Sequence, residues 1–161
     1  MTPRIAVPSD LNALLDAWEQ LVDAGTSAEP RFVRAPDARE PMRVWVQHSW
    51  LRHLPFPRCW VVDGPGYLHA FIAGFPLEPL PVITLPPTAR IGDLWVHPDQ
   101  RRSGVGTALV QAFFEGARAA GYPTLEVGTL ANDARATSFW RAQGFSDWQV
   151  TFRRDGKSQA R

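Results

Sequence analysis

The chain has 161 residues, of which 45% are hydrophobic and 20% are charged, a composition typical of one globular domain and not of a disordered or fibrous protein. Its formal net charge of +1 at pH 7 provides no overall field that would attract nucleic acid or an anionic membrane. The single cysteine excludes an intramolecular disulfide, and neither an apolar signal core nor a run of about 18 apolar residues is present, so we expect a cytoplasmic protein without a membrane span.

The first predicted elements are a strand and a helix. Residues 4–7 form a short strand ended by Pro8, and Ser9 can cap the helix that follows. Apolar residues then recur at helical spacing until Gly25, where we expect the helix to stop. Residues 26–40 are rich in proline, alanine and charge, and they predict a loop.

A second helix and an antiparallel hairpin come next. The helix is predicted over residues 41–54, because proline is favoured in a first turn and two prolines end the pattern. Residues 59–62 and 67–75 read as strands joined by the turn at residues 63–66. Residues 76–87 contain five prolines and predict a surface loop. The expected inner face of the second helix consists of Met42, Trp45, Val46 and Ser49.

The C-terminal half alternates strands and helices. Strands are predicted at residues 91–96, 124–130 and 145–153, with helices at residues 105–120 and 134–143. The element order therefore indicates an α+β fold, with a mixed central β-sheet flanked by about four helices. We expect a single domain over the whole chain, and its charged end, residues 155–161, is expected to be a frayed tail.

A basic, glycine-rich turn precedes the third helix. Its two glycines permit positive φ and a close backbone approach, and the first amides of the helix have no intrahelical partner. A helix N-terminus favours an anion, and two arginines directly upstream have the fork geometry that suits phosphate. This turn therefore predicts a pyrophosphate site. Its candidate residues are Arg101, Arg102, Ser103, Gly104, Val105, Gly106 and Thr107.

A dinucleotide-binding turn is the nearest alternative, since Gly104-x-Gly106 also opens a helix and Glu126 lies twenty residues further on. Three observations count against it. Residues 97–103 separate the strand from the first glycine, whereas a Rossmann turn follows its strand directly. The third glycine position is Leu109, and Glu126 falls near the start of its predicted strand and not at its end.

The motif context resembles a known family. Residues 101–106 fit the pattern Gln/Arg-x-x-Gly-x-Gly/Ala, and Leu94-Trp95-Val96-His97-Pro98 stands before them. Asn132, then Ala136-x-x-Phe139-Trp140-x-x-x-Gly144-Phe145, stands after them. This combination resembles the GCN5-related N-acetyltransferase (GNAT) superfamily, strongly from residue 90 to 145 and in element order from residue 4 to 75.

The resemblance implies that acetyl-CoA donates an acetyl group directly to a primary amine of a small molecule or peptide in a ternary complex. It implies no metal, and it leaves open a monomer or a homodimer. Backbone groups of Leu94, Trp95 and Val96 would pair with the pantetheine arm, and amides from Arg102 to Thr107 would bind the pyrophosphate. Asn132 or Asp133, with Phe139 and Trp140, would flank the thiol end.

The general base is open at this point. A lysine-type amine is mostly protonated at pH 7, and freeing its lone pair costs about 4.6 kcal/mol, against about 1.4 kcal/mol for an α-amine. Asp93 and Glu126 are the candidate catalytic residues, and His69 is a third possibility. The structural alternatives are an Asp93 held by neighbouring groups, a Glu126 that faces solvent or pairs across the sheet, and a packed His69.

Trp140 departs from the family pattern, which often has a tyrosine acting as general acid at this position. An indole cannot protonate a leaving thiolate, although a thiol of pKa about 8.5 can leave without help. Water or Ser138 is then the remaining proton source. A catalytically weak or inactive protein that binds acyl-CoA as a sensor or structural ligand is therefore the alternative function.

The acceptor pocket in this family lies mainly over the first two helices, which carry Trp45 and Trp50 here. Few acidic residues occur in this region, so a polycationic acceptor is not indicated. Neither the spacing nor the neighbours of the histidines indicate a metal site.

Overall fold

A computed structural model describes residues 1–78 and 81–154. Its centre is a five-stranded sheet in the order β1-β2-β3-β4-β5, antiparallel from β1 to β4 and parallel between β4 and β5. The predicted α+β fold with a mixed sheet is confirmed. The strands are β1 (Arg4–Ile5), β2 (Cys59–Gly64), β3 (Tyr67–Pro76), β4 (Thr88–Val96) and β5 (Thr124–Val127).

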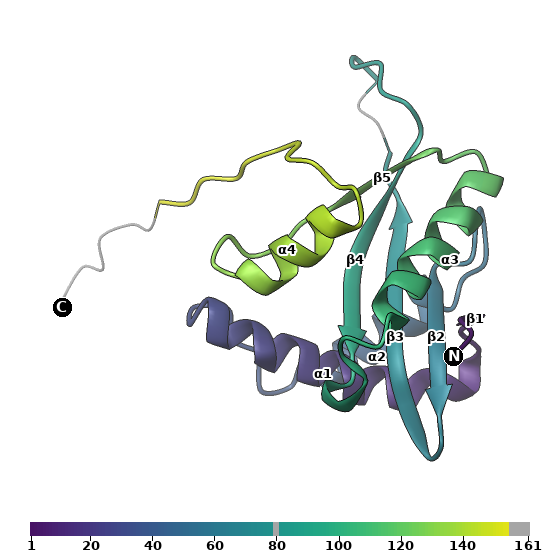
Figure 1. The fold of residues 1–161 in the computed structure, drawn as a ribbon, viewed down its shortest axis with the longest axis vertical. Helices are drawn as coiled ribbons and strands as arrows, with labels where there is room; N and C mark the ends of the chain where they lie inside the picture. Colours follow the sequence, from purple (N-terminus) through teal and green to yellow (C-terminus); the bar gives the residue numbers. More distant parts are fainter. Residues whose placement is uncertain (79–80, 155–161) are drawn as a thin grey trace.

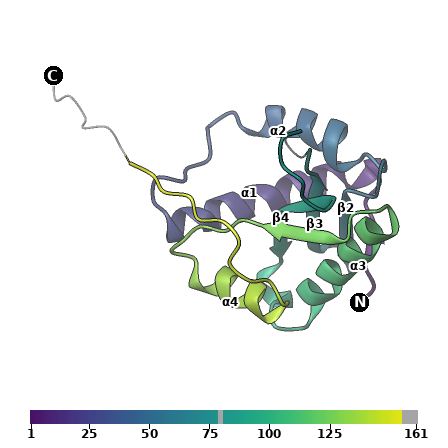
Figure 2. The same ribbon diagram turned by 90° about the horizontal axis from the view of Figure 1, so that it is seen from above.

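Helices cover both faces of the sheet (Figures 1 and 2). α1 (Leu11–Ala28) and α2 (Arg39–Trp45) lie on one face, and α3 (Val105–Ala119) and α4 (Ala134–Ala142) lie on the other. Short helical turns are added at η1 (Pro8–Asp10), η2 (Val46–Trp50) and η3 (Pro98–Gln100). No helix in the described part of the chain is long and apolar enough to cross a membrane.

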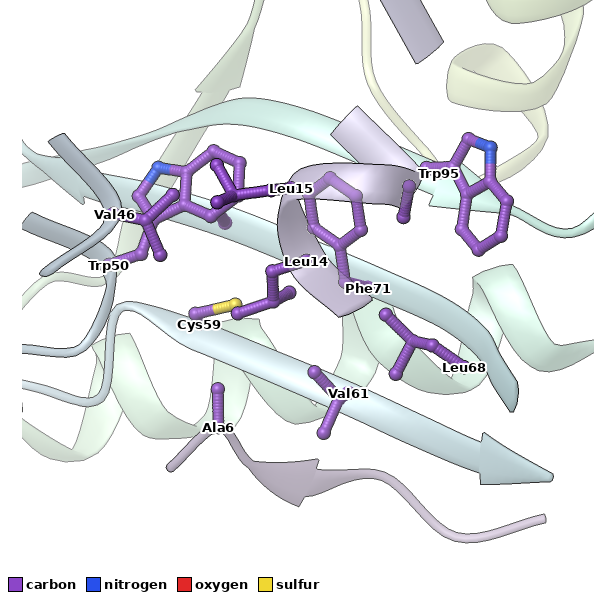
Figure 3. Close-up of a cluster of buried hydrophobic side chains, with 12 residues drawn as sticks. Ala6, Leu14, Leu15, Val46, Trp50, Cys59, Val61, Leu68, Phe71 and Trp95 are labelled. Atoms are coloured by element: carbon purple, nitrogen blue, oxygen red, sulfur yellow. The ribbon is translucent and has the colours of Figure 1, made fainter. Parts of the chain in front are cut away.

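Each face of the sheet has its own apolar core. The core under α1 and α2 joins Leu14 and Leu15 to Phe71 and Trp95 of the sheet (Figure 3). The core under α3 and α4 contains Leu109, Phe113 and Trp140, together with Ile72 and Ile91 from the strands. Because side chains alternate along a strand, β2, β3 and β4 each contribute to both cores.

The first helix is longer than predicted. It runs through Gly25 to Ala28 and ends where the Glu29 N–H donates to the Gly25 carbonyl, 3.0 Å away. A ring carbon of Phe32 lies 3.0 Å from the position that a Cβ of Gly25 would take. The glycine therefore serves a close approach of the following loop, and the prediction that it ends the helix is wrong.

The second helical segment has a different inner face from the predicted one. After α2 the chain continues as the π-type turn η2, in which the Leu51 N–H donates to the Val46 carbonyl at 3.0 Å. Val46 and Trp50, which are four residues apart, are buried on this segment, whereas Trp45 is 52% exposed. The assignment of Trp45 to the core is therefore wrong, and the helical segment ends at Trp50, before the predicted residue 54.

The strand predicted over residues 145–153 is also wrong, since residues 145–154 have no regular structure. Trp148, Val150 and Phe152 alternate as a strand requires, but they are 71%, 69% and 91% exposed. A strand needs a neighbour for its main-chain hydrogen bonds, and this segment pairs with no strand of the described chain. The tail predicted for residues 155–161 lies outside the described residues.

Candidate active site

β4 and β5 separate partway along β4. Their parallel pairing covers only Thr88–Ile91 against Thr124–Val127. The register between β3 and β4 then shifts at Gly92, which has no partner in the ladder, and β4 continues to Val96. Within the described chain, no strand pairs with this last part of β4 on the side facing away from β3.

The direction of the main-chain groups follows from the antiparallel register. The His97 N–H donates to the His69 carbonyl at 2.8 Å, and alternation directs the main-chain groups of Trp95 towards Phe71 of β3. The groups of Leu94 and Val96 then point away from β3. Trp95 is also 5% exposed, so its side chain belongs to the core. The expectation that all three residues offer backbone groups to a ligand is therefore corrected to Leu94 and Val96.

The glycine-rich turn has the geometry of an anion site. Gly104 is the N-cap of α3 with φ of +85°, Arg102 has φ of +66°, and no side chain caps the helix. The first helical bond runs from the Ala108 N–H to the Gly104 carbonyl at 3.0 Å, so the amides of Val105, Gly106 and Thr107 have no helical partner. The helix dipole adds to their positive potential.

Two side chains of this turn are used to build it. The Ser103 hydroxyl donates to the Gln100 carbonyl at 2.6 Å. Arg101 Nε donates to the Val96 carbonyl at 3.3 Å, which ties the turn to the exposed end of β4. The two terminal NH₂ groups of Arg101 have no hydrogen bond to the described residues, so they are available to an anion.

α4 packs against the start of α3. A Cβ built on Gly106 would lie 3.4 Å from ring carbons of Phe139 and 3.6 Å from a methyl group of Val96. Gln143 Nε2 donates to Thr107 Oγ1 at 3.0 Å from the same side. A Cβ at this position would make van der Waals contact with Phe139 and β4, so the start of α3 is closely packed against both.

The start of α4 shows which of Asn132 and Asp133 occupies the polar position of the family motif. Asp133 is the N-cap, and its Oδ1 accepts from the Ala136 N–H at 2.9 Å. Asn132 is exposed and lies outside the helix. Asp133 therefore takes the position that the motif spacing left open, and its carboxylate is engaged by the helix.

Asp93 faces the same side of the sheet as α1 and α2. Leu94 and Val96 pack against the opposite core and Trp95 belongs to this one, so alternation places Asp93 with Trp95. It completes a cross-strand row with Ala73 and Cys59. Burial raises the pKa of Asp93 from 3.8 to about 6, and no hydrogen bond or ion pair to the described residues is found for its carboxylate.

Glu126 already has a partner, and the buried His69 has one at Nδ1 but none at Nε2 among the described residues. Glu126 Oε1 accepts from Arg90 Nη1 at 2.8 Å, in an ion pair across β4 and β5. His69 is 6% exposed, its Nδ1 lies 3.3 Å from the Met1 sulfur, and its ring contacts Tyr67. Asp93 is therefore the carboxylate left available for proton transfer. No cluster of three potential metal ligands occurs within the described residues.

A family model described as the acetyltransferase (GNAT) family matches residues 18–145. The chain belongs to the GNAT family. The match spans the glycine-rich turn at residues 101–107 (the phosphate turn), the end of β4 and the α4 residues Phe139 and Trp140. It confirms the resemblance drawn from the motifs. No curated protein matches the chain.

Solved structures share the GNAT fold at low sequence identity. The tetramutant of the BH1408 protein from Bacillus halodurans has a TM-score of 0.75 at 20% identity, covering 96% of this chain and 99% of its own. The aminoglycoside 6′-N-acetyltransferase AAC(6′)-IG from Acinetobacter haemolyticus has a TM-score of 0.72 at 15% identity, covering 99% and 100%. AAC(6′)-Iy in complex with a CoA bisubstrate analogue of acetylneamine has a TM-score of 0.71 at 15% identity, covering 96% and 97%.

The position of the frequent family tyrosine is filled by a packed indole. Trp140 is 8% exposed, and its ring centroid lies 5.0 Å from that of Phe139 and 5.4 Å from that of Phe145. Ser138 is exposed and precedes Trp140 by two residues, so it projects from a different face of α4. Ser138 is thus unsuited to be the alternative proton donor.

Arg90, which pairs with Glu126, is a residue that the sequence analysis did not single out. It lies one residue before the predicted start of its strand, and its role depends on Glu126, which is distant in sequence. One Arg90 Nη atom also lies 3.0 Å from the position that a Cβ of Gly128 would take, just beyond β5. The available signal was a basic residue in a strand whose other charged residue is Asp93.

Proposed function

We propose that the protein is an N-acetyltransferase that transfers the acetyl group of acetyl-CoA to a primary amine by direct attack in a ternary complex. The observation that carries the proposal is the phosphate turn beside the unpaired end of β4. The amides that open α3 suit the pyrophosphate, and Leu94 and the N–H of Val96 offer main-chain groups to an extended pantetheine arm, as a neighbouring strand would. CoA has both a pyrophosphate and an extended pantetheine arm, so one molecule could bind both parts of the site.

In the transfer step, the lone pair of the amine attacks the thioester carbonyl carbon. The C–N bond forms, the C–S bond breaks, and the sulfur leaves as a thiolate. The attacking nitrogen gives up its proton to Asp93, directly or through one water. A carboxyl with a pKa of about 6 is ionised at pH 7 and still basic enough to be an effective acceptor.

The leaving thiolate has no tyrosine hydroxyl to protonate it. A thiol of pKa about 8.5 is a tolerable leaving group, so the thiolate departs and takes a proton from water. Trp140 then serves as a packing residue between α4 and the core. This arrangement slows the transfer relative to one with a general acid without preventing it.

A small or peptide amine with few charges is the acceptor that we favour. Neighbours named as aminoglycoside acetyltransferases direct the first test to small-molecule amines. The acidic residues of α1, however, are engaged by arginines: Arg39 pairs with Asp16 and Glu19 at 2.7 and 3.2 Å, and Arg34 binds Asp23 at 3.0 Å. A polycation would find these carboxylates neutralised.

The deciding experiment is acetylation of an amine panel, with free CoA detected by a thiol reagent and acetylated product by mass spectrometry. The panel contains monoamines, amino-acid amides, short peptides, polyamines and aminoglycosides. We expect multiple turnovers with at least one acceptor, and none with Gly104→Glu, which places a negative charge at the phosphate turn. Absence of CoA binding at millimolar concentration would refute the proposal.

The second candidate function is a GNAT protein that binds acyl-CoA as a sensor or structural ligand without turnover. Trp140 at the tyrosine position favours it. This function predicts a thermal shift with acetyl-CoA but no CoA release with any amine in the panel. Multiple turnovers with a single acceptor exclude it.

A further inference from the structure

His97 lies between the sheet and the short helix η3, which leads into the phosphate turn. Its N–H donates to the His69 carbonyl of β3 at 2.8 Å, just beyond the end of β4. His97 is also the N-cap of η3, and the Gln100 N–H donates to its carbonyl at 2.8 Å. The same residue therefore ends the pairing with β3 and starts the connection to the phosphate turn.

The imidazole of His97 accepts a hydrogen bond at one of its nitrogens. The Asp99 N–H donates to His97 Nδ1 at 3.3 Å, so the side chain caps η3 as an asparagine would cap a longer helix. The Asp99 carboxylate lies 3.7 Å from the same nitrogen, beyond hydrogen-bond distance. A ring nitrogen that accepts carries no proton, so the capping imidazole is neutral and has its hydrogen on Nε2.

The His97 ring also packs against two aromatic side chains of the sheet. Its centroid lies 4.6 Å from that of Tyr67 and 5.7 Å from that of Trp95. The Tyr67 ring in turn lies 4.7 Å from the ring of the buried His69. Ring contacts at these distances are stabilising. Because Trp95 and His69 are buried, the capping ring is attached to the body of the protein as well as to η3.

Side-chain hydrogen bonds join η3 to the phosphate turn. The Ser103 hydroxyl donates to the Gln100 carbonyl at 2.6 Å, and Gln100 Nε2 donates to the Tyr67 hydroxyl at 3.5 Å. Gly104, which follows Ser103, is the N-cap of α3. The direction of the first α3 amides therefore depends on where η3 is held.

We propose that His97 is a positioning residue for the CoA site, which holds η3, and through it the phosphate turn, so that the first amides of α3 face the pyrophosphate. It acts through η3 and not by contact with the ligand. The proposal rests on the proposed function, because it assumes that the ligand is CoA. Histidine suits this position because it combines an acceptor with a ring, whereas the common capping residues asparagine, aspartate and serine have no ring.

Three substitutions separate the two contacts of the imidazole. His97→Asn keeps an acceptor without a ring, His97→Phe keeps a ring without an acceptor, and His97→Ala keeps neither. In titration calorimetry, the dissociation constant for CoA should rise about tenfold in His97→Ala and about threefold in each of the other two variants. The KM for acetyl-CoA should rise in the same order while kcat stays within about twofold, because the groups that react are left in place.

His53→Ala is the matched control, since His53 is an exposed histidine outside the helices, the strands and the phosphate turn. It should bind CoA as the unchanged protein does. Nitrogen NMR of the histidine rings tests the cap without any ligand. The ring signals that disappear in His97→Asn should show a hydrogen on Nε2 and none on Nδ1.

Four results would overturn the proposal: an unchanged CoA affinity in His97→Ala, an equal loss in His53→Ala, no recovery in His97→Asn or His97→Phe relative to His97→Ala, or a hydrogen on Nδ1 of His97. If the unchanged protein bound no CoA, the proposed function would fail as well. Normal CoA binding by both the unchanged protein and His97→Ala would overturn the role of His97 alone.

Discussion

Replacing Asp93 with asparagine should lower catalysis and raise stability at the same time. Asparagine has nearly the same shape, but it cannot accept a proton at neutral pH. For a lysine-type acceptor, loss of a general base lowers kcat by about 10²- to 10³-fold. The effect should be smaller for an α-amine, because about 3 kcal/mol less is needed to free its lone pair at pH 7.

The stability gain follows from the burial of the carboxylate. The pKa of Asp93 rises from 3.8 in the unfolded chain to about 6 in the fold, so the folded state holds the proton more tightly. Above pH 6 the ionised side chain lowers the free energy of unfolding by about 3 kcal/mol, and at pH 5 by about 1.6 kcal/mol. Below the unfolded pKa the side chain is protonated in both states and the effect disappears. Asp93→Asn should therefore be more stable by up to these amounts, with a gain that grows from pH 4 to pH 7.

Urea unfolding at pH 4, 5 and 7 measures the stability gain, and steady-state acetylation measures kcat over the same range. An acceptor whose amine stays unprotonated throughout isolates Asp93, whose titration should make activity rise as pH passes about 6. Glu126→Gln is the matched control and should keep both the inflection and most of the rate, because Arg90 already engages this carboxylate. An unchanged rate in Asp93→Asn would refute the base assignment, and a gain independent of pH would refute the burial argument.

Three further predictions concern the phosphate turn and the tryptophans. Gly104→Ala should lower the free energy of unfolding by about 1 kcal/mol, because an alanine is strained at a φ of +85°. This variant should still bind CoA, because its Cβ meets nothing within 4 Å. Gly104→Glu should abolish the thermal shift with CoA. Trp140→Tyr and Trp140→Phe should have equal kcat within about threefold if this position only packs; a large excess for tyrosine in the acetylation assay would show that a proton donor is limiting. In urea unfolding, Trp50→Ala should lower the free energy of unfolding by about 3–5 kcal/mol, and Trp45→Ala should lower it by less than about 1 kcal/mol. The reverse order would contradict the observed burial of Trp50 and exposure of Trp45.

The conformation of the glycine-rich turn at residues 101–107 could be predicted from sequence because its determinants are local. Two glycines, two arginines and the start of an amphipathic helix lie within a few residues, and the structure places them as their spacing indicates. The packing of α4 against this turn is different. It depends on the contact between Phe139 and Gly106, and no spacing in the chain specifies that contact.

The failed assignments share a physical cause. Alternation at Trp148, Val150 and Phe152 predicts a strand, but alternation supplies only side chains, and a strand also requires a neighbouring ladder that local sequence does not provide. In the second helix the predicted Val46 is buried, but Trp45 is exposed and Trp50 joins the core, where the hydrogen bonds change to five-residue spacing. A periodic pattern carries no sign of such a change.

β4 has a bulge at Gly92, a residue without a partner in β3. This bulge is the reason why the position of Asp93 could not be predicted from strand alternation alone. An unbroken strand would place Ile91, Asp93 and Trp95 on one face, and the carboxylate would then enter the core under α3. The extra residue reverses the alternation, so Ile91 stays in that core while Asp93 and Trp95 turn to the side of α1 and α2. The same irregularity lies where β4 loses its pairing with β5 and leaves Leu94 and Val96 without a strand partner on that side. One inserted residue thus places these main-chain groups next to the Asp93 carboxylate, and the proposed transfer step depends on that arrangement.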